Sequence, residues 1–208
     1  ERVELKLLKA QGNVEVWLRD LEKNMQETLK VKMEKALEAL NREDAPTKKE
    51  WVKQHHSQLI IAVDSIEWTR ITEDYLQSEN AIEDIEKWYE SILAQLIDLT
   101  ELIRGELTSI ERRTIVALVT QDVHYRDIVE QLKNDQVDNP NDFKWQQQLR
   151  FYFRNKICEA RQVNSTLPYG YEYLGATTRL VITPLTDRCW MTITGALHIQ
   201  LGAAPAGP

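Results

Sequence analysis

The chain has 208 residues, of which 28% are charged and 42% hydrophobic, and its formal net charge is −7 at pH 7. This length is enough for one or two hydrophobic cores. The acidic balance argues against a nucleic-acid-binding protein, which needs a basic stripe to neutralise phosphates. No apolar run approaches the roughly 20 residues that span a bilayer. We therefore expect neither a nucleic-acid partner nor a membrane partner.

The first predicted helix begins after Gly12 and Asn13, because an asparagine side chain can cap free backbone amides. Apolar residues then recur every three or four positions, at Trp17, Leu18, Leu21, Met25, Leu29, Met33, Leu37 and Leu40. This stripe suits either a coiled-coil seam or a face packed against neighbouring helices. Steps of four predominate over an alternation of three and four, which favours packing.

A proline interrupts this helix, and a second helical region follows it. Pro46 lacks a backbone amide proton, and Thr47 and Glu50 have the spacing of a capping box that restarts a helix. The run 51–71 is apolar almost all round in its middle, so we expect it to be enclosed by other helices.

Two more long helices are predicted, one from Asn80 to Gly105 and one from about Glu106 to Leu132. Gly105 is the expected stop of the first, since glycine adopts a left-handed cap without steric cost. A polar loop covers 134–142. Four long helices with short connections predict an antiparallel helical bundle or array.

The pattern changes after Asp142. Aromatic residues crowd the segment 143–153, which we interpret as a last amphipathic helix that packs the bundle against the following segment. Strand-like runs are predicted at 157–163, 169–174 and 179–183, with loops between them. The expected class is therefore mainly α: a helical bundle followed by a short β-containing segment that opens an α/β module.

One more helix is predicted near the end of the chain. Thr186 or Asp187 can cap it, and Gly202 is its expected end. The change from helical to strand-like patterning places a domain boundary near Val163.

Catalytic and metal-binding patterns are scarce. His55 and His56 are adjacent, and neighbouring residues on a helix point about 100° apart, so they do not form a chelating pair. No serine or cysteine stands in a nucleophile turn such as G-x-S-x-G. Cys158 and Cys189 lie far apart without a CxxC spacing, which fits a reducing compartment. The sequence predicts no catalytic residue and no metal site.

The end of the chain resembles the opening of a nucleotide-binding module. Gly207 can be the first glycine of a phosphate-binding loop G-x-x-x-x-G-K-[ST], although the lysine and the Ser/Thr are absent. The runs 169–175, 179–189 and 202–208 resemble the start of the first AAA+ module of a dynein heavy chain, and Leu180-Val181-Ile182-Thr183-Pro184-Leu185-Thr186-Asp187-Arg188 carries this likeness most specifically. Its wording is more similar to axonemal than to cytoplasmic dyneins. The runs 13–18, 51–69, 118–124 and 143–152 resemble the linker that precedes this module.

This resemblance implies a division of the chain and a set of site residues. It implies that 1–163 is the C-terminal helical part of the linker and that 164–208 is the start of the first AAA+ module, truncated at its phosphate loop. The family would bind ATP or ADP with Mg²⁺ there. The implied nucleotide-binding residues are the adenine-side wall and the first two phosphate-loop positions, namely Val181, Ile182, Thr183, Pro184, Leu185, Thr186, Cys189, Gly207 and Pro208.

The resemblance also implies a biological setting. The starting Glu1, with no initiator Met, indicates that the chain is a piece of a longer protein. The implied partners are the remainder of the heavy chain with its AAA+ ring, microtubules, and the dynein intermediate and light chains. The implied location is the cytoplasm and cytoskeleton, at the axoneme of a cilium or flagellum. The intact protein would be an ATP-driven motor, whereas the piece alone is expected to be inactive.

A different class of function stays open on the residues alone. The chain would then be a non-enzymatic helical scaffold whose mixed C-terminal tail docks onto another protein. The sequence that continues after Pro208 in the parent protein discriminates between the two, because an Ala-Gly-Thr-Gly-Lys-Thr continuation completes a phosphate loop.

Overall fold

The computed structural model describes residues 9–206, and it is mainly helical with one small antiparallel sheet. This confirms the predicted fold class. The elements in chain order are α1 (Val14–Leu40), α2 (Lys48–Trp51), α3 (Ser57–Leu76), α4 (Ala81–Arg104), α5 (Ser109–Asn134), α6 (Phe143–Gln146), β1 (Arg150–Arg154), β2 (Ile157–Gln162), β3 (Ser165–Pro168) and α7 (Pro184–His198). None of these helices has the length and apolarity that a membrane crossing needs.

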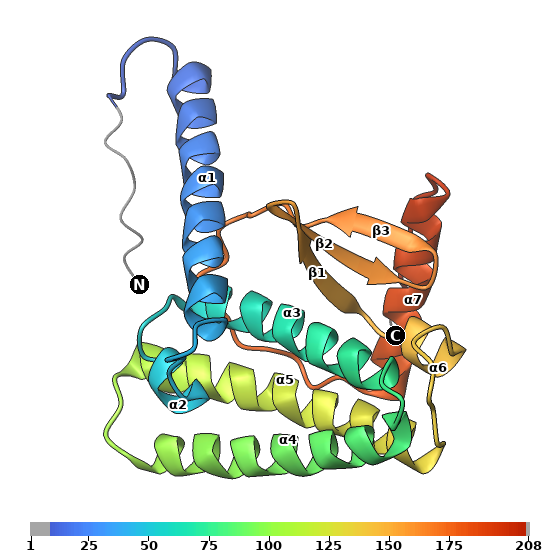
Figure 1. Ribbon diagram of the computed structural model, residues 1–208. Coiled ribbons are helices and arrows are strands. Elements are labelled where there is room, and N and C mark those ends of the chain that lie inside the picture. Colours follow the sequence, from blue (N-terminus) through green and yellow to red (C-terminus); the bar gives the residue numbers. More distant parts are fainter. Residues whose placement is uncertain (1–8, 207–208) are drawn as a thin grey trace.

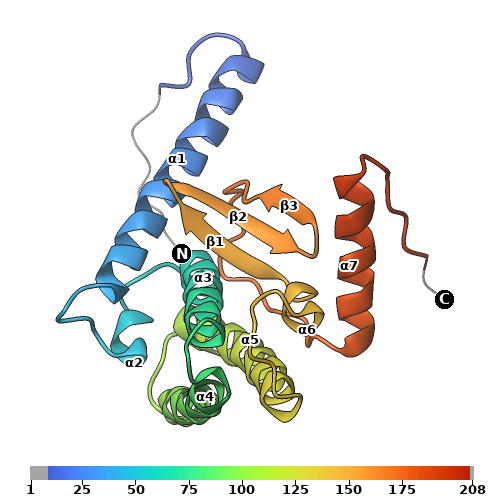
Figure 2. The same cartoon turned by 45° about the vertical axis from the view of Figure 1, so that its right-hand side comes forward.

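Helices α3, α4 and α5 form the base of the molecule, and α1 stands across them (Figure 1). The sheet has the strand order β1-β2-β3 and lies over α3, and α7 lies beside β3 (Figure 2). The β1–β2 hairpin turns through Asn155 and Lys156, whose φ angles are 51° and 62°. Positive φ at both turn residues matches the right-handed twist of the flanking strands.

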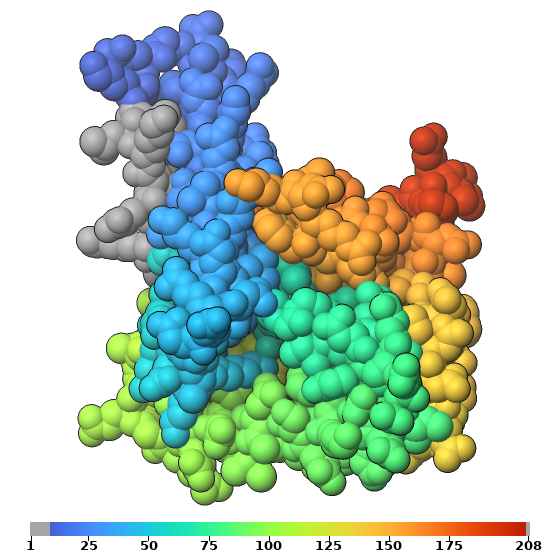
Figure 3. Space-filling view, viewed as in Figure 1, coloured from blue at the N-terminus to red at the C-terminus, as the bar shows by residue number. Residues whose placement is uncertain are grey.

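The C-terminal half of α1 packs against the body. Leu29, Met33 and Leu37 are buried there, which agrees with the predicted packing face. In the other half of the stripe Leu18 is 46% exposed, while Trp17, Leu21 and Met25 are half-buried. The N-terminal half of α1 therefore projects from the molecule, as Figure 3 shows in blue. Asn13 occupies the predicted N-cap position, but its side chain makes no capping hydrogen bond.

Two hydrophobic cores hold the helices together. The first lies between the end of α1, α2, α3, the C-terminal part of α4, α5 and β2, and the second lies between α3, α4, α5 and α6. In the first, the Trp51 Nε1 donates to the carbonyl oxygen of Ala36 at 3.1 Å. In the second, the rings of Trp68 and Tyr125 stack with centroids 4.0 Å apart. Each fully buried large side chain contributes about 1.5–3 kcal/mol, so the cores dominate the stability of the bundle.

The capping box at Thr47 and Glu50 is confirmed, but the helix that it starts is short. It ends at Trp51, and α3 begins anew after His56, which stands at its N-cap position. The Gly105 expectation is only partly right. Gly105 ends α4 with φ −79°, so it is extended and not left-handed. The Arg112 guanidinium donates to the carbonyl oxygens of Ile103 and Gly105 at 2.7 and 3.3 Å, which satisfies these groups without a left-handed turn.

The prediction of an amphipathic helix over 143–153 is wrong. One helical turn, α6, is followed by strand β1, in which Arg150 and Tyr152 are buried on one face while Phe151 and Phe153 pack on the first core from the other. A period of two, with aromatic residues on both faces, is the pattern of a strand.

The strand predictions are right only for β2. The run 169–174 forms no strand in the described residues, and neither does 179–183, because neither has a ladder partner there. Conversely, β3 lies in a stretch that we predicted as a loop, and it pairs with β2 across Val163 and Asn164. A strand depends on a neighbour for its hydrogen bonds, which a local sequence pattern does not supply.

The last helix has a different cap and a different end from those predicted. Thr183 is the N-cap, since Thr183 and Thr186 form a reciprocal capping box and Pro184 takes the first helical position. A residue before proline is held extended, which suits an N-cap. The helix ends at His198, and not at Gly202, in a left-handed turn at Gln200 with φ 61°.

Candidate functional site

The predicted site residues lie on residues 169–183, here called the strap, and on the start of α7. The strap leaves β3 and runs back along α3 and α5 (Figure 1). Its first half is held by Gln58 on α3. The Gln58 Nε2 donates to the Tyr169 hydroxyl at 3.0 Å and to the Glu172 carbonyl at 2.6 Å, and the Leu174 backbone N–H donates to Gln58 Oε1 at 2.8 Å. One buried side chain thus fixes the strap to the helical body.

The second half of the strap is open to solvent. Val181 is 74% exposed and Leu185 is 71% exposed, while Thr183, Pro184 and Cys189 are also exposed. Ile182 and Thr186 are half-buried. Gly207 and Pro208 lie outside the described residues. The structure therefore brings seven of the nine predicted residues together at one turn and the first part of one helix.

Local physical chemistry explains the shape of this turn. Pro184 fixes its own φ, and Thr183 receives the Thr186 N–H on its Oγ1 at 3.4 Å. Leu185 and Cys189 are four residues apart, so they share one face of α7. The turn therefore presents apolar side chains outward from a rigid helix start, and such a surface suits the flat face of an aromatic ring system.

Helix α7 is attached to the body by polar contacts. None of its residues is buried. The Ser165 hydroxyl donates to the Thr194 carbonyl at 3.1 Å, and the Thr194 hydroxyl donates to Gln162 Oε1 at 2.9 Å. His124 on α5 lies 3.9 Å from Asp187. Burial lowers the pKa of His124, and burial likewise raises the pKa of Asp187, so both groups are shifted towards their neutral forms.

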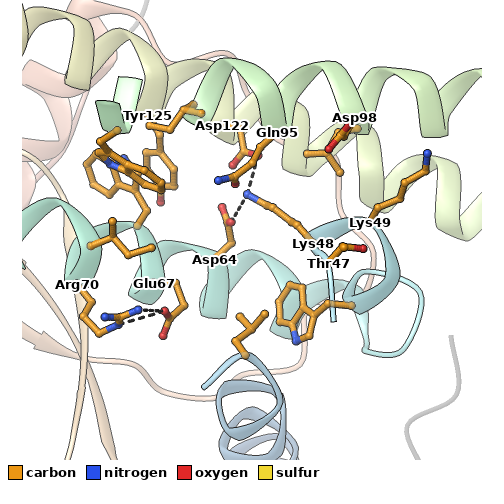
Figure 4. A pocket seen from close by; sticks show the side chains of 17 residues that line it. Thr47, Lys48, Lys49, Asp64, Glu67, Arg70, Gln95, Asp98, Asp122 and Tyr125 are labelled. Carbon is orange, nitrogen blue, oxygen red and sulfur yellow. Dashed lines mark hydrogen bonds and ion pairs between the residues drawn. The ribbon is translucent and has the colours of Figure 1, made fainter. Parts of the chain in front are cut away.

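A second polar cluster, which the sequence analysis missed, lies between α2, α3 and α5. The Lys48 Nζ lies 2.5 Å from Asp64 Oδ1 and 2.8 Å from Asp122 Oδ2 (Figure 4). Gln121 donates to the other Asp64 oxygen at 3.0 Å. Lys48, Asp64 and Asp122 border a cavity of about 360 Å³ that Trp51 also lines. The sequence does contain one sign of this cluster, because Asp64 is the single charged residue inside the apolar run 59–66.

The charges of this cluster decide what it can do. Burial alone would lower the pKa of Lys48, but the charges of Asp122 and Asp64 outweigh burial and raise it. Burial and the charge of Asp64 raise the pKa of Asp122. A lysine amine must lose its proton to act as a nucleophile, so Lys48 is a structural cation that ties three helices together.

Metal chemistry has no support among the described residues. Within 9–206, no three His, Cys, Asp or Glu side chains are placed to hold a metal ion. Cys158 is buried, its pKa is raised to about 12 by burial, and it is unsuited to attack as a thiolate.

Known proteins share both the sequence of the strap and that of the body. Residues 169–208 match the family described as "Hydrolytic ATP binding site of dynein motor region". The chain is 41% identical over 199 residues, or 95% of its length, to dynein axonemal heavy chain 1 of Homo sapiens. It is 41% identical over 97% of its length to dynein axonemal heavy chain 3 of Mus musculus, and 42% identical over its whole length to dynein axonemal heavy chain 6 of Homo sapiens.

These relatives are far longer than the chain, which spans only 4% to 5% of their length. The likeness covers both the helical body and the exposed strap, and it confirms the resemblance found in the residues. The chain is a homologue of one short stretch of the axonemal dynein heavy chains, and its last part carries the nucleotide-site sequence of that family.

Proposed function

We propose that this chain joins the mechanical and the nucleotide-binding parts of an ATP-driven motor. In this proposal residues 1–163 are the C-terminal helical part of a dynein linker, and 164–208 open the first AAA+ module. The observation that carries the proposal is the family match over 169–208, which falls on an exposed, rigid, apolar turn.

The proposed nucleotide wall consists of Val181 to Thr186 together with Cys189, Gly207 and Pro208. Pro184 and Leu185 would cover one face of the adenine, and the backbone near Ile182 and Thr183 would read its edge. The sequence contains no G-x-x-x-x-G-K-[ST] motif, so the lysine that meets the phosphates and the hydroxyl that holds Mg²⁺ would come from the rest of the parent protein. ATP or ADP with Mg²⁺ would complete this site in the intact motor.

The fold supports a mechanical role for the helical part. Packed helices move as rigid bodies because their interiors are close-packed, so a displacement at one end reaches the other. Gln58 connects α3 directly with the strap, and α1 projects from the same body. We propose that nucleotide-driven movement of the ring acts on these helices, and that the intact motor, with its intermediate and light chains, works on microtubules in an axoneme.

The test uses an intact dynein heavy chain that contains this segment. Leu185→Asp should weaken ATP binding at least roughly tenfold, because burying a leucine side chain is worth about 1.5–3 kcal/mol and a carboxylate beside the base adds an uncompensated charge. Equilibrium binding of a fluorescent ATP analogue measures the change.

The control is Leu18→Asp, which places the same change on an exposed leucine of α1. It should leave nucleotide affinity unchanged. Equal affinities in the wild type and in Leu185→Asp would remove Leu185 from the nucleotide wall.

A further inference from the structure

A polar cavity of about 310 Å³ is lined by residues of β1, of α6 and of the end of α3, among others. Three arginines line it: Arg150 and Arg154 from β1, and Arg161 from β2. One carboxylate, Glu73, also lines it, and neutral hydrogen-bonding side chains complete the wall, among them Gln77, Asn141, Gln146 and Thr166. Such a set of groups points to an anionic ligand.

The register of the sheet places the three guanidinium groups on one face. Arg150 and Arg154 are four residues apart on β1, and side chains two or four apart along a strand share a face. Arg150 pairs directly with Arg161 across the antiparallel ladder. Like charges opposite each other on a sheet are destabilising, and a bound anion relieves that repulsion.

The nearby carboxylates do not neutralise all three arginines of the cavity. Glu73 lies 3.6 Å from Arg150 and also accepts hydrogen bonds from the Trp145 Nε1, at 3.2 Å, and from the Tyr152 hydroxyl. Glu159 forms an ion pair with Arg161. Arg154 has no carboxylate within ion-pair distance anywhere in residues 9–206. Three guanidinium groups thus face two carboxylates, and the excess charge sits on Arg154.

One buried donor in the cavity wall also lacks an acceptor. Arg150 is only 3% exposed, and its Nε makes no hydrogen bond to the described residues. Its Nη1 and Nη2 are engaged, by the Tyr152 hydroxyl at 3.1 Å and by Gln146 Oε1 at 2.8 Å. A buried unsatisfied donor is costly and is rare in native proteins, so it is a mark of a missing acceptor.

We propose that this arginine cavity binds a phosphate group. Guanidinium forks suit tetrahedral oxyanions, and a phosphate brings four oxygens that the Arg150 Nε, Arg154 and the neutral amide and hydroxyl groups of the wall can satisfy together. A single carboxylate has only two oxygens and would leave part of this wall unused. The same chemistry serves free phosphate and a phosphate monoester on serine. The cavity shares no residue with the proposed adenine wall, so it stands apart from that function.

The experiment is a calorimetric titration of the full 208-residue chain with inorganic phosphate at constant ionic strength. The wild type should bind phosphate saturably. Arg154→Ala should weaken binding roughly tenfold, the usual effect of losing one charge-assisted hydrogen bond. The matched control is Arg19→Ala, which removes an exposed arginine from the projecting half of α1 and should bind as the wild type does.

A second readout guards against a folding defect. Phosphate should raise the thermal midpoint of the wild type and of Arg19→Ala, and it should raise that of Arg154→Ala much less. A phosphoserine peptide titrated in parallel separates the two sources: tighter binding of the peptide indicates a phosphate ester, and tighter binding of inorganic phosphate indicates the free ion. Absence of saturable binding to either, or an equal loss in both arginine variants, overturns the proposal.

Discussion

The backbone N–H of Leu174 donates to the side-chain oxygen of Gln58 across 116 residues of sequence, at 2.8 Å. The amide nitrogen of the same side chain holds the Glu172 carbonyl and the Tyr169 hydroxyl. A single glutamine on α3 therefore makes three hydrogen bonds to a strap that has no strand partner of its own in the described residues.

Replacing Gln58 by alanine should free the strap. We expect a loss of about 1–3 kcal/mol in unfolding free energy, because buried partners are left unpaired. The amide proton of Leu174 should exchange with solvent at least roughly tenfold faster, since it loses its acceptor. Hydrogen exchange followed by NMR measures this rate.

The control is Gln58→Glu, which keeps an acceptor oxygen for Leu174 and should preserve the protection of that amide, although it loses both donated bonds. Unchanged exchange at Leu174 in Gln58→Ala would contradict the role of Gln58 in holding the strap.

The Lys48 cluster should make stability depend on pH. The pKa of Asp122 is raised in the folded state above its ordinary value of 3.8, so the folded chain binds more protons than the unfolded chain above that pH. Unfolding free energy should then fall as pH rises from about 4 towards the folded-state pKa of Asp122. Asp122→Asn should flatten this part of the profile and cost little at neutral pH, because Asp64 still pairs with Lys48. Urea unfolding at a series of pH values measures the slope, and an identical slope in the variant would show that Asp122 is not its source.

Lys48→Met removes the cation of the same cluster, whereas Asp122→Asn removes one of its carboxylates. It leaves two buried carboxylates without a cation, and breaking a buried pair in this way costs about 3–5 kcal/mol. The loss should exceed that of Asp122→Asn in the same urea series at neutral pH. If the two variants lose equal amounts, Lys48 does not hold the three helices together in the way described.

Replacing Gln200, just after the end of α7, by glycine should stabilise the end of that helix. Gln200 is left-handed with φ 61°, and its neighbour Leu201 donates its backbone N–H to the Ala196 carbonyl at 2.8 Å. Together with the 3.0 Å bond from the Gln200 N–H to Leu197, this is a Schellman motif, whose left-handed position usually carries glycine. Gln200→Gly should slow exchange of the Leu201 amide and stabilise the helix end by about 1 kcal/mol. Gln200→Ala keeps the Cβ atom and should give no such gain; an equal effect of both would refute the assignment to backbone strain.

Local patterns predicted the helical body well, and long-range pairing is where prediction failed. The capping box at Thr47 and the polar loop after α5 follow from neighbouring residues, and both are present. The aromatic segment after Asp142 was misread because a strand of period two and a short helix share its composition. The pairing of β3 with β2 and the clamp by Gln58 depend on residues distant in sequence, which no local pattern encodes.

The same limit applies to the sites. The motif Val181–Thr186 was visible because its residues are contiguous, whereas the Lys48 cluster draws on three helices and the arginine cavity on three strands and two helices. The isolated charge of Asp64 in the apolar run 59–66 was the one feature of the sequence that could have indicated the Lys48 cluster. A tertiary fold is needed to show which charged residues meet.

Helix α7 carries no buried residue, and its anchors are a few hydrogen bonds and one distant His–Asp contact. Each such hydrogen bond contributes only about 0.5–1.5 kcal/mol, because water replaces it when it opens. The two hydrophobic cores of the body do not include α7, so lifting this helix away leaves them intact. Detachment of α7 would therefore leave the packing of the helical bundle unchanged, and Gln58 would still hold the first half of the strap on α3.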